Sequence, residues 1–457
     1  MKLTKKVLGV VVTALIGATA FAQRISIEQG PFNYYEAGNI ISNTRISTVG
    51  LYYTDVDNFM SVTRWNTVKP ETFFGHIGYE DELNVGFAKQ FKDFYIGTSF
   101  VGQLDGLTST TTNNDGDKTT TTETSVENAF TAAALFGFGN MAFKATAAWN
   151  GADITNTKNV DGDVKKEEIF NLNINLENGF ITKLDDKPLE MSFLLGLDSS
   201  VDKKVDETAD SKTDLSTYTI NVGSSALWTF DTKEKYTQEG LLHLYTSWAI
   251  PSYSQDIGGV KSKGFGMYNN SIALIPEYRI TLNPTERLSM KAGATLPFTF
   301  DFEGDFDYSE TDGDKVYNNL RTENVDVEIQ PMISLGMIYQ VLPEKVNFNM
   351  GIEFATPSLT WETVTTKTRT DVTSKDVDAT STSTVYNYND YIAGVNFGSG
   401  FTVQLAKTVT FDCYWNILSN IFGDDFKSGL NEGNNNFWNT VNKIFVHNIG
   451  FSISAKF

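Results

Sequence analysis

The residues of this chain best suited to chemistry are polar and charged side chains at every second position of extended segments. Lys144, Glu277 and Arg279 are examples, and each has an apolar residue on either side. Successive side chains of a β-strand point to opposite faces, so such segments have one polar face and one apolar face. A polar face of mixed acids, bases and amides can attract and hydrogen-bond small polar solutes. The candidate solute-lining residues are Lys144, Asn173, Glu190, Asn221, Glu277, Arg279, Lys291, Asp326, Glu328, Asn349 and Glu353.

The histidines and hydroxyl residues do not form a catalytic or metal-binding motif. His76, His243 and His447 are scattered and lack the spacing of metal ligands. No Ser/His or Asp/His constellation is specific enough to indicate a hydrolase. We therefore expect neither enzymatic activity nor a cofactor.

The tripeptide Asp-Gly-Asp occurs at 115–117, 161–163 and 312–314. Carboxylates suit calcium, but an EF-hand register would put Thr111, Thr157 and Tyr308 at the first ligand position, so none of the three matches. Asp-Gly is also a strong hairpin-turn signal. We expect three hairpin tips, with calcium binding as the alternative.

Long strands must position these polar residues. Leu288 to Phe302 is apolar at every second residue, and a turn at Asn283–Glu286 joins it to the preceding strand. Soluble sandwiches usually have strands half this length, whereas a membrane-spanning strand needs about 9 to 11 residues plus any extension into loops. The pattern predicts an all-β, transmembrane, antiparallel up-and-down β-barrel at 71–457. It has about 16 strands, with 14 or 18 as alternatives.

The connections alternate in length, as outer-membrane barrels require. Short turns are expected near Lys92, Gly139, Asp231, Asn283, Pro343 and Lys407. Between them we expect long polar loops at 105–127, 150–168, 198–216, 251–266, 303–324, 357–387 and 418–438. Pro276 and Pro331 would each remove a ladder hydrogen bond, so they predict a bulge or bend.

The N-terminus has the features of an export signal, residues 1–22. Lys2, Lys5 and Lys6 precede an apolar stretch, and Ala20-Phe21-Ala22 before Gln23 is a cleavage site. Residues 23–70 are not periodic, and could form a periplasmic extension, a plug in the lumen or an extra hairpin. The net charge of −20 argues against a nucleic-acid partner, and the single cysteine excludes an intramolecular disulfide.

The last residues alternate Ile449, Phe451, Ile453, Ala455 and Phe457 with polar residues or glycine. A terminal aromatic on such a strand resembles that of bacterial outer-membrane β-barrel proteins. The resemblance implies that the assembly machinery of the outer membrane reads Phe457, that lipid surrounds the barrel, and that the long loops are extracellular. Residues 54–66 and 86–97 are similar to spirochaete outer-membrane proteins.

These observations predict a porin-like channel for passive diffusion of small polar solutes. The loop at 303–323 holds seven carboxylates, Glu303, Asp305, Asp307, Glu310, Asp312, Asp314 and Glu323. Such a mouth enriches cations and predicts a mild cation preference. Two alternatives stay open: a surface adhesin or structural barrel with a plugged lumen, and a transporter of hydrophobic substrates. Whether three copies associate into a homotrimer also stays open.

Overall fold

The computed structural model describes 17 ranges of the chain. They are residues 61–65, 71–77, 82–103, 109–115, 119–158, 163–206, 211–233, 235–257, 260–264, 267–305, 308–311, 314–317, 320–355, 359–368, 379–388, 394–419 and 449–456. The predicted signal peptide with Ala20, Ala22 and Gln23 lies outside them, as does Phe457. No helix in these ranges is long and apolar enough to cross a membrane.

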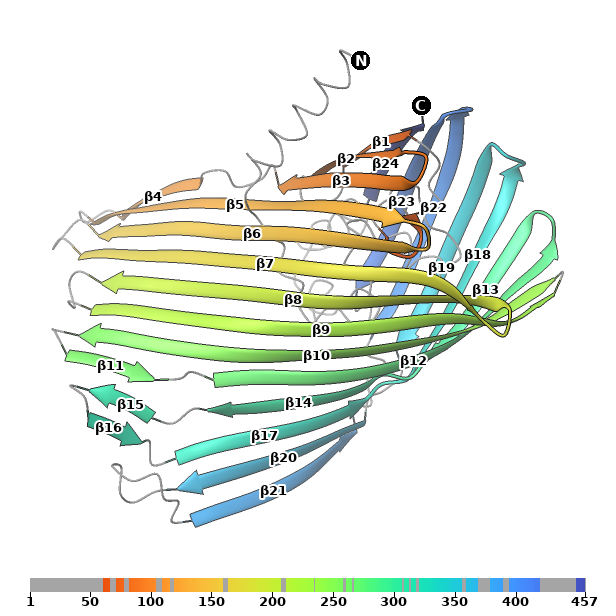
Figure 1. The fold of residues 1–457 in the computed structure, drawn as a ribbon. Coiled ribbons are helices and arrows are strands. Elements are labelled where there is room, and N and C mark those ends of the chain that lie inside the picture. The colour runs from red at the N-terminus through yellow and green to blue at the C-terminus, as the bar shows by residue number, and fades with distance from the viewer. Residues whose placement is uncertain are drawn as a thin grey trace, which may run out of the picture.

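The strands form a single antiparallel sheet that closes on itself (Figure 1). β1 (Glu71–Ile77) pairs with β2 (Glu82–Gln90) on one side and with the last strand, β24 (Ile449–Lys456), on the other. The wall is a closed barrel of 16 antiparallel strands. The predicted fold class and strand number are therefore confirmed.

Some wall strands consist of two consecutive elements, and some short strands lie in hairpins beyond the wall. The first half of the wall contains β3 (Phe94–Gln103), β5 (Thr119–Phe138), β6 (Met141–Lys158), β7 (Asp163–Leu184), β8 (Lys187–Asp206), β9 (Ser211–Lys233) and β10 (Tyr236–Ile257). The second half contains β12 (Met267–Thr285), β13 (Leu288–Thr295) with β14 (Phe298–Asp305), β17 (Leu320–Ile329) with β18 (Met332–Leu342), β19 (Val346–Ala355) with β20 (Leu359–Thr368), β21 (Ala379–Tyr388) with β22 (Gly394–Ala406), and β23 (Val409–Ser419). The hairpin strands are β4 (Ser109–Asp115), β11 (Val260–Gly264), β15 (Tyr308–Thr311) and β16 (Asp314–Tyr317).

The wall is interrupted where prolines lie on neighbouring strands. Pro297 separates β13 from β14, and Pro331 separates β17 from β18. The pairing of β12 with the next strand is interrupted at Pro276, where the Leu296 amide donates to the Pro276 carbonyl at 3.0 Å. Each proline lacks an amide donor, so the ladder breaks at these points. Pro331 was expected as a bend, whereas the break at Pro297 interrupts a strand that we expected to be continuous.

Several predicted long loops, such as those at 198–216 and 357–387, are shorter than expected because part of their sequence continues the strands, whereas the loop predicted at 418–438 lies almost wholly outside the described residues. β9 has 23 residues, and β20 pairs with β21 through Thr363 with Thr384 and Thr365 with Thr382. Threonine is β-branched and favours strands. Both faces of these extensions are largely polar, so the alternation that marks a strand in the sequence is lost. At about 3.3 Å per residue, β9 is far longer than a bilayer requires, so the extended hairpins project beyond it.

One aspartate of each Asp-Gly-Asp tripeptide lies at a strand end, and the other two residues of each tripeptide lie outside the described residues. Asp115 pairs with Thr119, Asp163 with Lys158 and Asp314 with Thr311. At the opposite end of the barrel the connections are tight. Gly139 has a φ of 58°, and Asp185 and Asp186 have φ of 50° and 61°. Positive φ at both central residues, as at Asp185 and Asp186, is what a type I′ hairpin turn requires. The predicted Asp-Gly tips themselves lie outside the described residues, and the turn at Asp185–Asp186 is one that the pattern did not indicate.

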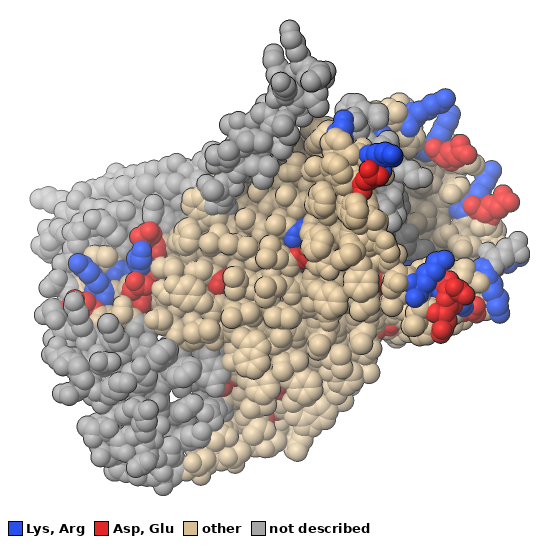
Figure 2. Space-filling view, viewed as in Figure 1, with Lys and Arg blue, Asp and Glu red and all other residues tan. Residues whose placement is uncertain are grey.

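The outer face of the wall is apolar. On β8, Phe193, Leu195 and Leu197 are exposed, and the same holds for Met141 and Phe143 on β6. Figure 2 shows a central band of the wall with few charged residues, while lysines, arginines and acids gather at the ends of the strands. An outward apolar band between charged ends is the surface that a lipid bilayer requires of a barrel.

Candidate functional site: the barrel interior

The alternation of each strand puts its polar residues inside. On β6, Lys144 is 2% exposed, whereas its neighbour Phe143 is 52% exposed. Asn221, Glu277, Arg279, Lys291 and Asn349 are likewise buried. The candidate site is therefore the inner surface of the barrel.

One inward ion pair joins β6 and β7. Lys144 and Glu177 are direct cross-strand partners, and the Lys144 Nζ lies 2.7 Å from Glu177 Oε1. The two side chains are 1% and 12% exposed, so solvent screens their attraction little. The two opposite charges of this pair neutralise each other within the wall.

A second ion-paired cluster crosses β10, β12 and β13. The Arg279 guanidinium binds both oxygens of Glu277, with Nη2 donating to Oε2 at 2.8 Å. Lys291 Nζ lies 2.9 Å from Glu239 Oε2, and Glu239 is the cross-strand partner of Arg279. Acids and bases are therefore balanced in this cluster.

A hydrogen-bond network of amides links β7, β8, β9 and β10. Asp198 accepts from the side-chain amides of both Asn173 and Asn221. Asn175 donates to Asn173 at 2.7 Å, and the Tyr245 hydroxyl donates to Asn221. A side chain on Gly196 would meet Asn175 Oδ1 at 2.5 Å, so a glycine there leaves room for the network. This network satisfies its polar groups within the wall.

The inner surface of β14, β17 and β20 is acidic. Asp301 pairs with Asp326, and Asp326 pairs with Glu362, so three carboxylates stand in one cross-strand row. Glu328 lies two residues further along the same face, paired with Thr299 and Thr360. Like charges directly opposite each other are destabilising. Mobile cations in the lumen would relieve this repulsion.

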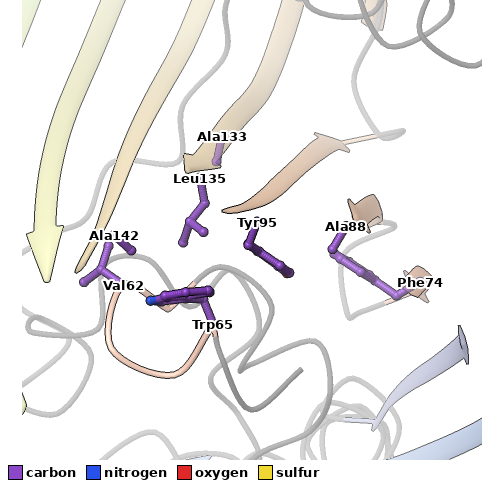
Figure 3. Close-up of a cluster of buried hydrophobic side chains, with 8 residues drawn as sticks. All are labelled: Val62, Trp65, Phe74, Ala88, Tyr95, Ala133, Leu135 and Ala142. Carbon is purple, nitrogen blue, oxygen red and sulfur yellow. The ribbon is translucent and has the colours of Figure 1, made fainter. Parts of the chain in front are cut away.

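An apolar patch occupies the inner face of β1 to β6, and the turn at Ser61–Trp65 lies on it (Figure 3). The wall contributes the buried side chains of Phe74, Ala88, Tyr95, Ala133, Leu135 and Ala142. Val62 and Trp65 complete the cluster, and the rings of Trp65 and Tyr95 are 5.7 Å apart. The alternating pattern of the strands predicts a mostly polar inner face, so this apolar patch is not expected from the sequence.

A small polar cavity separates the turn at Ser61–Trp65 from the charged wall. Its volume is about 60 Å³. The wall residues that line it are Lys144, Glu177, Glu190, Ser192, Ser225, Leu227, Leu241, His243 and Arg279, and the turn contributes Ser61 to Arg64. Lys144, Glu190 and Arg279, three of the predicted solute-lining residues, therefore meet at one place.

The remaining predicted residues are dispersed around the wall. Asn173 and Asn221 belong to the amide network, Lys291 to the ion-paired cluster, and Asp326 and Glu328 to the acidic surface. Asn349 is buried on β19, where its cross-strand partner on β18 is Ile338. Glu353 pairs with Ser334, and its side chain is outside the described part.

Several residues of the barrel interior were not predicted from the sequence. Glu177 follows Asn173 and Asn175 at the next alternate position, so the same pattern, extended by two residues, predicts that it faces inward. Asp198 and Glu362 fell in predicted loops that proved to be strand. Residues 61–65 have no periodicity, and no signal in the sequence placed them against the wall. Within the described ranges, no group of three or more His, Cys, Asp or Glu side chains is placed to hold a metal ion.

Comparisons with known proteins add little beyond architecture. No family model matches the chain, and a search of curated proteins found no relative. Among solved structures, the toluene transporter TbuX of Ralstonia pickettii is 9% identical, with 92% of this chain and 97% of that chain covered and a TM-score of 0.39. The ferric yersiniabactin uptake receptor FyuA of Yersinia pestis is 8% identical, with 77% and 69% covered and a TM-score of 0.36. At this distance the fold assignment rests on the strand pairing of the chain itself.

Proposed function

We propose that this chain forms a channel in a bacterial outer membrane, through which small polar solutes diffuse passively with a mild preference for cations. The main support for the proposal is that the same strands have an apolar outer face and a polar inner face. Phe143 and Leu195 face outward, whereas Lys144 and Arg279 are buried inside. An apolar exterior suits lipid, and a barrel of about sixteen strands is wide enough for an aqueous lumen.

The acidic inner surface supports the cation preference. Asp301, Asp326 and Glu362 stand in one row, whereas acids and bases of the ion-paired clusters balance. A fixed net negative charge on the wall of an aqueous pore attracts cations within about 8 Å at physiological salt. The extended hairpins would then face the cell exterior, and assembly would use the outer-membrane machinery.

The decisive experiment is single-channel conductance of the purified protein in a planar bilayer under a salt gradient. We expect stable current steps and a reversal potential on the cation-selective side. A folded barrel that gives no steps would favour the second candidate, a structural or adhesive barrel with a plugged lumen. The turn at Ser61–Trp65, which lies inside the barrel, is the observation that keeps that candidate open.

Neutralising the acidic row is expected to reduce the cation preference. In the triple variant Asp301→Asn, Asp326→Asn, Glu362→Gln, the cation-to-anion permeability ratio should fall toward about one, because the acidic row loses its three negative charges. Reversal potentials measure the ratio.

The matched control neutralises three exposed carboxylates at the short turns, Asp185→Asn, Asp186→Asn and Glu344→Gln. It removes the same formal charge outside the lumen, so its permeability ratio should stay close to that of the unmodified protein. Equal effects of the two triple variants would show that overall charge, and not the acidic row, sets the preference.

A further inference from the structure

The turn at Ser61–Trp65 is seated on a row of small residues. Gly137 of β5, Ala142 of β6 and Gly179 of β7 are consecutive cross-strand partners on the inner face. A side chain on Gly137 would lie 2.6 Å from Trp65 Cδ2, and one on Gly179 would lie 2.5 Å from the Val62 carbonyl oxygen. The wall therefore has space for this turn only because these two positions lack a side chain.

Both ends of the turn are buried against the wall. Val62 and Trp65 are each 5% exposed. The Trp65 amide donates to the Ser61 carbonyl at 3.1 Å, which holds the turn closed with both side chains directed at the patch (Figure 3). The small residues of the wall leave room for the bulky residues of the turn, so the two surfaces are complementary in shape. A single added methyl group on the wall would disturb this packing.

The turn also reaches the charged part of the interior. Arg64 lines the polar cavity together with Arg279, and it interacts electrostatically with Glu239 and Lys291 on β10 and β13. Residues 61–65 therefore lie between the small residues Gly137, Ala142 and Gly179 of β5 to β7 and the ion-paired cluster of β10, β12 and β13. Residues 61–65 occupy the lumen near the end of the barrel that has the short turns, because Gly137 is only two residues before the turn at Gly139–Asn140.

We propose that residues Ser61–Trp65 form a luminal strap, seated on Gly137 and Gly179, that constricts the pore at its short-turn end and opens it when displaced. The strap narrows the pathway beside the ion-paired clusters, so it would regulate flux rather than set charge preference. This inference rests on the proposed channel function, because it assigns regulation to the same lumen.

Substitutions in the wall that displace the strap test the proposal. The double variant Gly137→Ala, Gly179→Ala adds side chains where Trp65 and the Val62 backbone lie, and alanine within a strand does not itself weaken the barrel. Gly223→Ala is the matched control, because Gly223 is also buried on the inner face but a side chain there meets Leu194 at an ordinary 3.4 Å. Val62→Ala with Trp65→Ala releases the strap without altering the wall.

Two measurements are made on each folded protein. Trypsin cleavage after Arg64 reports whether the strap is displaced, independently of conduction, and single-channel conductance reports the constriction. Heat-modifiable migration confirms that the barrel is folded. In both double variants we expect faster cleavage after Arg64 and about a twofold rise in conductance, since a wider aqueous path conducts more. Gly223→Ala should match the unmodified protein in both.

The outcomes separate the two proposals. Faster cleavage with unchanged conductance in a conducting protein would overturn the strap and leave the channel. Unchanged cleavage in both double variants would overturn the seating of the strap on the glycines. A released strap in a folded barrel that never conducts would overturn the channel, and the strap as its regulator with it.

Discussion

Replacing Arg279 by methionine is expected to destabilise the barrel by about 3 to 5 kcal/mol, because it leaves the buried Glu277 carboxylate without its partner. Arg279 and Glu277 are 3% and 1% exposed at their side chains. Water cannot take the place of the guanidinium at such a site without rearrangement of the wall. Urea-induced unfolding in detergent micelles, followed by heat-modifiable migration, measures the loss.

Two further variants show whether the unpaired charge causes this loss. In Glu277→Gln, Arg279→Met no charge is left unpaired at that site, so most of the lost stability should return. Arg287→Met removes an arginine from an exposed turn and should change stability by no more than about 0.5 kcal/mol. If Arg279→Met costs as little as Arg287→Met, the interior at this level is well hydrated and the ion pair has little structural role.

The second large effect is expected on the outer face. Leu195→Arg places a charge in the middle of β8, among the outward side chains of Leu176 and Val222, which are its cross-strand neighbours. An arginine facing lipid near the bilayer midplane costs about 2 to 4 kcal/mol. We expect this loss in the free energy of folding into lipid vesicles, together with a lower yield of folded barrel.

The same substitution nearer the turn is the control. Leu189 lies on the same strand and the same face as Leu195 but close to the turn at Asp185–Asp186. Charges near the interface cost only about 0 to 1 kcal/mol, because the side chain reaches water. Equal costs at Leu189 and Leu195 would contradict a bilayer around this wall, since an aqueous environment has no depth dependence.

The sequence predicts which residues face the interior of the barrel, but not which of them contact each other. The alternation around Lys144 and around Glu277 and Arg279 correctly separates inward from outward residues, because the period of a strand is two. It cannot pair Lys144 with Glu177 or Lys291 with Glu239, because these contacts depend on the register between strands. Register follows from turn geometry and strand order, which are properties of the whole sheet.

Other features had no readable signal. The hairpin extensions at Thr363–Thr366 and Ser381–Thr384 are largely polar on both faces, so nothing in their pattern distinguishes strand from loop. The position of Trp65 depends on Gly137 and Gly179, which are distant in the sequence and become neighbours only across β6. A glycine in a strand indicates a close approach but does not identify what approaches.

By itself, the sequence determined that this chain is a barrel with an apolar exterior and a polar interior, because local alternation and turn residues specify strands, faces and short turns. Only the tertiary structure decided which charges neutralise each other, where Asp301, Asp326 and Glu362 leave an acidic surface, and that Ser61–Trp65 lies inside. The physical reason is that each of these contacts joins residues on different strands or distant segments. Closure of the sheet brings them together, and no local pattern encodes that proximity.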